Sequence, residues 1–83
     1  MNTSPELTLP VDKEIDAAGL ACPLPIVRTK KALAGMASGQ VLRVLGTDPG
    51  SLDDMPAFAE SGGHTLLAST RDGDHFVFLI RKG

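Results

Sequence analysis

The chain has 83 residues, of which 42% are hydrophobic, and its formal net charge at pH 7 is −2. This length accommodates one small domain, and the acidic balance argues against direct nucleic-acid binding, because a phosphate-binding surface needs an excess of basic residues. The sequence shows no basic segment followed by an apolar run, so we expect neither a secretory signal nor membrane insertion. Its single cysteine excludes an internal disulfide and, as a free thiol, fits a cytoplasmic location.

The first half of the chain shows two strand patterns separated by a helical one. Apolar and charged residues alternate over residues 11–17, which predicts a strand at a sheet edge. Apolar residues at three- and four-residue steps predict a helix over residues 25–36, ended by Ser38-Gly39. Residues 40–46 form a nearly continuous apolar run of strand length.

A second helix is predicted after the turn Asp48-Pro49-Gly50-Ser51. Ser51, with Asp54 three residues later, resembles a capping box at its start. Gly62-Gly63 ends this helix. The expected buried stripe consists of Leu52, Met55, Phe58 and Ala59.

The last quarter predicts a hairpin, because Asp72-Gly73 separates strand-like segments at residues 64–70 and 74–81. The first two strands, joined by a helix, should be parallel. The densest apolar runs belong to the second and fourth strands, which places them in the centre of the sheet. The sequence thus predicts an α/β two-layer domain, βαβαββ, with strand order 1-2-4-3 and both helices on one face. The other face would expose alternate side chains of the fourth strand.

These elements assign residues 11–83 to a single domain. Residues 1–10 are polar and carry two prolines, which predicts a flexible leader.

The only cysteine lies in Gly19-Leu20-Ala21-Cys22-Pro23-Leu24-Pro25, just before the first predicted helix. The unpaired N–H groups and the dipole of a helix N-terminus favour the thiolate, which is the reactive form. Residues before proline avoid helical angles, so we expect Cys22 and Leu24 to be extended and the helix to begin at Pro23 or Pro25. The N–H groups that could face the sulfur belong to Leu24, Ile26 and Val27. The alternative is that Cys22 is a small buried hydrophobe, as free cysteines usually are.

Basic residues follow the cysteine along the predicted helix, and no acidic residue interrupts them, whereas the second predicted helix is acidic. This contrast would steer an acidic partner towards the thiol. The residues that we assign to partner binding are Pro23, Leu24, Pro25, Arg28 and Lys31. The alternative is that both charge sets are ordinary solvated helix faces.

No other residues point to a site. His64 and His75 occur singly, and nothing in the sequence places either near Cys22 for a cysteine–histidine pair. The aspartates between residues 48 and 54 match no calcium-loop spacing. We therefore assign no metal and no cofactor.

The stretch from Asp16 to Pro25 resembles the Cys-Pro-X-Pro motif of the TusA/SirA family of small sulfur-carrier proteins. The resemblance spans nearly everything from Lys13 onward, and Leu24 stands where some members carry an acidic residue. It implies a two-layer sandwich whose strand order agrees with the one argued above. Further matching segments are Lys31-Ala32-Leu33, Thr47-Asp48-Pro49-Gly50-Ser51 and Phe78-Leu79-Ile80-Arg81-Lys82.

The resemblance implies that Cys22 accepts sulfane sulfur as a persulfide from a cysteine desulfurase or a rhodanese-like donor and passes it to an acceptor protein. In the family, the sulfur goes to the 2-thiouridine of tRNA, to molybdenum-cofactor assembly or to dissimilatory sulfur oxidation. The lack of a second cysteine fits this role, because a neighbouring thiol would discharge the persulfide as a disulfide.

Two other hypotheses stay open. A non-catalytic interaction or regulatory module would use the open sheet face around Val77, and Cys22→Ser would leave it active. A redox-sensing thiol would form sulfenic acid or a mixed disulfide instead of taking up sulfur.

Overall fold

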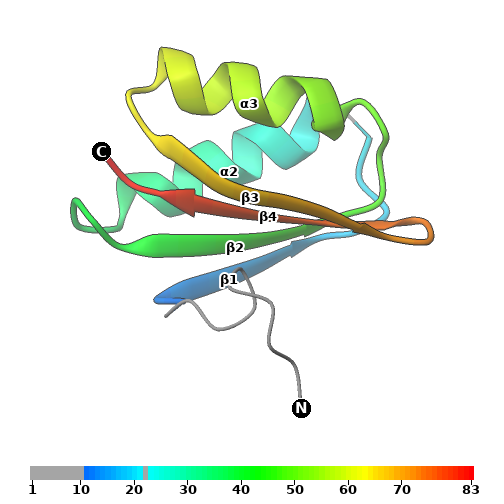
Figure 1. Ribbon diagram of the computed structural model, residues 1–83, viewed down its shortest axis with the longest axis horizontal. Helices are drawn as coiled ribbons and strands as arrows, with labels where there is room; N and C mark the ends of the chain where they lie inside the picture. Colours follow the sequence, from blue (N-terminus) through cyan, green and yellow to red (C-terminus); the bar gives the residue numbers. More distant parts are fainter. Residues whose placement is uncertain (1–10, 22) are drawn as a thin grey trace.

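A computed structural model describes residues 11–21 and 23–83 of the chain. Its elements follow the predicted order of strand, helix, strand, helix and two strands (Figure 1). They are β1 (Lys13–Ala17), α2 (Leu24–Ala34), β2 (Val41–Gly46), α3 (Ser51–Ser61), β3 (Thr65–Asp72) and β4 (His75–Arg81). The predicted leader, residues 1–10, lies outside the described residues.

The four strands form one mixed sheet in the order β1-β2-β4-β3, which confirms the predicted topology. β1 and β2 are parallel, and β4 is antiparallel to both β2 and β3. Both helices cover the same face of the sheet (Figure 1). Because β1 and β2 are parallel and a helix follows each, α2 and α3 begin at the same edge of the sheet.

The core lies between the helices and the central strands, where alternate residues of β2 and β4 face the helices. Two register pairs join these strands in the core, Val44 with Phe78 and Leu42 with Ile80. All four side chains are fully buried. The largest helix side chains that meet them are Leu33 of α2 and Met55 of α3. Apolar burial of this kind contributes about 25 cal/mol for each Å² removed from water.

The face away from the helices is less open than the sequence predicted. Val77 is half-buried, and Leu79, which alternates with the core residues of β4, is only 2% exposed. Its register neighbours are Arg43 on β2 and Ala68 on β3, and the methylenes of an arginine can cover adjacent apolar surface. The expectation that alternate side chains of the fourth strand are exposed is therefore wrong for Leu79.

The ends of the helices differ from prediction. α2 ends at Ala34, not beyond Met36, because Gly35 is its C-cap and donates its N–H to the carbonyl of Ala32. Gly39, with φ of +88°, instead shapes the turn that enters β2.

The start of α3 also differs. Gly50 is the N-cap and the buried Ser51 is the first helical residue, so Ser51 does not occupy the cap position that the predicted capping box requires. Leu52 was expected in the buried stripe but is 37% exposed. The helix is turned about its axis relative to the prediction, so that its core-facing positions, four residues apart, are Ser51, Met55 and Ala59.

Candidate functional site

The helix that follows the motif begins at Leu24, with Pro23 as its N-cap. In the sequence, Cys22 immediately precedes this cap, but it lies outside the described residues. The expectation that Leu24 is extended is wrong, because Leu24 opens the helix and its N–H donates to the carbonyl of Ala21 at 3.0 Å. The N–H of Val27 donates to the carbonyl of Pro23 at 3.0 Å. Two of the three N–H groups proposed to face the sulfur, those of Leu24 and Val27, therefore donate to backbone carbonyls instead.

A hydrogen bond fixes the loop that leads to the motif. The N–H of Gly19 donates to the hydroxyl of Thr47 at 2.8 Å, which ties the loop after β1 to the loop after β2. Within the first loop, the N–H of Ala18 donates to the carboxylate of Asp16 at 2.9 Å. Thr47 lies in one of the segments that resemble the family, but the sequence suggested no role for it. Its position directly after a strand parallel to β1 is the signal that could have suggested one.

The first turn of α2 is anchored to the core from inside. Pro25 and Thr29 are buried, and the Thr29 hydroxyl donates to the Pro25 carbonyl at 2.8 Å. Met55 of α3 lies beside this hydroxyl, with its sulfur at 3.9 Å. Among the motif residues, Pro25 therefore packs inward, whereas Pro23 and Leu24 are exposed.

Exposed apolar side chains surround the start of the two helices. Leu24 is 49% exposed and Val27 is 55% exposed on α2. Leu52, in the first turn of α3, belongs to the same edge of the molecule because both helices begin there. Leu52 was expected in the buried stripe of the second helix, and Val27 was named only for its N–H group, so the exposure of neither side chain was predicted. Apolar side chains exposed together at one edge are typical of a surface that meets another protein.

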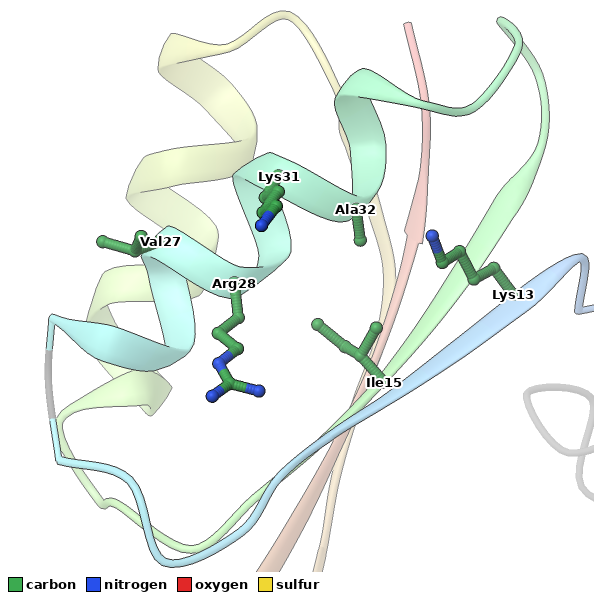
Figure 2. A pocket seen from close by; sticks show the side chains of 6 residues that line it. All are labelled: Lys13, Ile15, Val27, Arg28, Lys31 and Ala32. Carbon is green, nitrogen blue, oxygen red and sulfur yellow. The ribbon is translucent and has the colours of Figure 1, made fainter.

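A cavity of about 610 Å³ opens between α2 and β1 (Figure 2). It brings the predicted binding residues Arg28 and Lys31 together with Lys13, which sequence analysis assigned only to an edge strand. The remaining lining residues are Ile15, Val27 and Ala32. A cationic rim with an apolar floor results.

The histidines do not join this region. His64 follows the end of α3, away from the helix starts; it stacks against Phe58 with ring centroids 5.7 Å apart and accepts the N–H of Gly83 on Nδ1. His75 is exposed and alternates with Phe76, which faces the core. Within residues 11–21 and 23–83, no group of three acidic, histidine or cysteine residues is arranged to hold a metal ion. Neither described helix is long and apolar enough to cross a membrane.

Known proteins similar to this chain share one family. Residues 13–82 match the family described as Sulfurtransferase TusA. The sulfur carrier protein TusA of Allochromatium vinosum is 56% identical over 71 residues, which cover 86% of this chain and 93% of that protein. The putative sulfur carrier protein YrkI of Bacillus subtilis is 56% identical over 72 residues, which cover 87% of this chain and 96% of that protein. A crystal structure of a SirA-like protein from Desulfitobacterium hafniense, 33% identical, matches with a TM-score of 0.76 over 86% of this chain and 97% of its own.

Proposed function

This chain belongs to the TusA sulfurtransferase family, as the Cys-Pro-Leu-Pro stretch suggested, and from this premise we propose that Cys22 carries sulfane sulfur as a persulfide between two proteins. The observation that supports this most directly is the position of the motif. In the sequence, Cys22 immediately precedes Pro23, the N-cap of α2, and α2 and α3 begin at the same edge of the sheet. Helix N-termini favour anions such as a thiolate or a persulfide.

In the proposed step, the Cys22 thiolate attacks the outer sulfur of a persulfide on the donor. A new S–S bond forms between Cys22 Sγ and that sulfur, the donor's S–S bond breaks, and the donor leaves as a thiolate. The acceptor thiolate then attacks the outer sulfur on Cys22 in the same way. Each transfer conserves electrons, so the relay needs no cofactor or metal.

The surface around the motif supports contact with protein partners. Pro23 and Leu24, which follow Cys22 in the sequence, are exposed, and Val27 and Leu52 extend the apolar surface. Arg28 and Lys31 add positive charge next to it, while Pro25 positions the first turn from the core. We propose a cysteine desulfurase or a rhodanese-like protein as donor and a protein thiol as acceptor, within the cytoplasm, where free cysteines persist. The downstream routes that we propose are tRNA 2-thiouridylation, cofactor assembly and sulfur oxidation.

The alternative of an interaction module on the other sheet face has less support. Leu79 is buried there and Val77 is half-buried, so that face offers little exposed apolar area.

The test is sulfur loading followed by intact-mass measurement. The reduced chain is incubated with a cysteine desulfurase and cysteine, or with a rhodanese and thiosulfate, with Cys22→Ala as control. We expect one added sulfur atom, absent in the control and transferable to an acceptor thiol. Oxygen adducts or mixed disulfides without sulfur uptake would instead identify a redox-sensing thiol. If neither donor leaves an adduct, Cys22 is not a carrier.

A further inference from the structure

The cavity between α2 and β1 collects positive charge from two separate elements. Figure 2 shows Lys13 and Ile15 reaching from β1 towards α2, and Arg28 reaching from α2 towards β1. Lys31 lies one turn further along α2. Three cationic side chains therefore surround an apolar floor.

No acidic side chain neutralises these cations within the part of the chain that the structure describes. β1 alternates, so Lys13 and Ile15 face the helix side, whereas Glu14 and Asp16 face away. Glu14 pairs with Arg43 at 3.3 Å, and the Asp16 carboxylate accepts the N–H of Ala18. The charges of β1 are thus sorted, with the cations on the cavity side. An anion from outside the described residues would relieve the repulsion among them.

We propose that this cavity receives glutamate or aspartate side chains from an acidic, extended segment of the donor or acceptor protein. This inference rests on the proposed function, and it specifies that the segment that docks is negatively charged.

Three observations favour a protein segment as the occupant. The aliphatic part of an acidic side chain fits the floor formed by Ile15 and Ala32. β1 is the outermost strand of the sheet and pairs only with β2 among the described strands, so its other edge faces the side from which an extended segment would approach. Val27 lines the cavity and also belongs to the exposed apolar surface beside the motif, so the two are continuous.

The binding test uses a short fluorescein-labelled peptide in which glutamates alternate with leucine and threonine, titrated by fluorescence anisotropy. The neutral control peptide replaces each glutamate with glutamine. The chain offers matched variants, because Lys30 is exposed on the same helix but does not line the cavity. The variants compared are Lys13→Gln, the double variant Arg28→Gln with Lys31→Gln, and Lys30→Gln.

We expect the acidic peptide to bind and the neutral peptide not to bind. The double variant should bind about tenfold more weakly and Lys13→Gln about three-fold, as expected when exposed charge contacts are removed. Lys30→Gln should bind as the wild-type chain does. If Lys30→Gln and Lys13→Gln weaken peptide binding equally, the peptide responds to the general charge of the chain and not to the cavity, which would overturn the proposal. Free glutarate binding as tightly as the peptide would overturn the choice of a protein segment.

Failure of this inference is distinguishable from failure of the proposed function. Sulfur uptake by the wild-type chain from inorganic polysulfide, read by intact mass, needs no docking segment. Uptake without peptide binding overturns only the cavity proposal. Peptide binding without uptake by Cys22 overturns the relay and, with it, the assignment of the segment to a donor or acceptor.

Discussion

The N–H of Gly19 and the hydroxyl of Thr47 are joined by a hydrogen bond of 2.8 Å that spans 28 residues of sequence. It connects the loop that leads to Cys22 with the loop that leads to α3. The two helix starts are therefore held relative to each other by a bond independent of the sheet.

Thr47→Val keeps the shape of the side chain and removes the hydroxyl. We expect a loss of about 1 kcal/mol in the free energy of unfolding, because the Gly19 N–H loses its partner. Urea denaturation measures the loss, and sulfur loading from polysulfide should slow as the loop loosens. Thr47→Ser, which retains the hydroxyl, should restore both. Equal stability of the valine variant and the wild-type chain would show that this bond contributes nothing.

Gly19→Ala tests the backbone of the same loop. Gly19 has φ of +81°, and a Cβ added there would meet no atom within 4 Å, so strain alone decides the outcome. We expect a loss of about 1–2 kcal/mol in the free energy of unfolding. Gly46→Ala is the matched control, because that Cβ also meets nothing within 4 Å and its φ is not positive. If both variants lose the same free energy of unfolding, the positive φ of Gly19 does not explain the loss.

Two leucines of α2 should separate stability from partner contact. Leu33 is 2% exposed in the core, so Leu33→Ala should lower the free energy of unfolding by about 3 kcal/mol. Leu24 is 49% exposed, so Leu24→Ala should change it by less than about 0.5 kcal/mol. The Leu24 variant should instead take up sulfur from a donor protein more slowly than the wild-type chain does. Its uptake from polysulfide should equal that of the wild-type chain. A Leu24 variant that accepts sulfur from the donor protein at the wild-type rate would exclude this side chain from the contact surface.

Lys82 tests how the end of the sheet is tied to α2. Its ammonium donates to the carbonyl of Met36 at 2.6 Å, just beyond the C-terminus of the helix, where a cation is also favoured by the dipole. We expect Lys82→Met to lower the free energy of unfolding by about 1 kcal/mol. Arg81→Met, an exposed neighbour without a described ion pair or side-chain hydrogen bond, is the control and should have little effect. If the two variants unfold alike in urea, the bond to Met36 is not stabilising.

The topology was predictable because its signals are local and strong. Asp72-Gly73 specifies a hairpin, a helix between two strands requires a parallel crossover, and the apolar run from Phe76 to Ile80 requires a central strand. The helix ends were harder, because both Gly35 and Gly39 are compatible with a helix stop. Only the packed structure distinguishes the C-cap from the later turn.

The site was predictable only in part. The predicted helix start and the basic residues along that helix identified Cys22 and the binding residues, and the family resemblance added the sulfur-carrier role; these assignments stay predictions. The cavity was missed because Lys13 and Arg28 come from different elements, and their proximity depends on how α2 lies over β1. The exposure of Leu52 was missed because the spacing of apolar residues does not fix the rotation of α3 about its axis, and this rotation decides which of them face the core.

The division of α2 into two faces has an evolutionary consequence. Three buried residues, Pro25, Thr29 and Leu33, hold the helix on the sheet, while Leu24, Val27, Arg28 and Lys31 are exposed on the same short segment. Because these exposed residues are not part of the core, gene duplicates of this chain could acquire different partners by substitutions there without changing the fold. If Cys22 carries sulfur as proposed, these exposed residues of one helix are the positions at which such duplicates would come to differ in donor or acceptor.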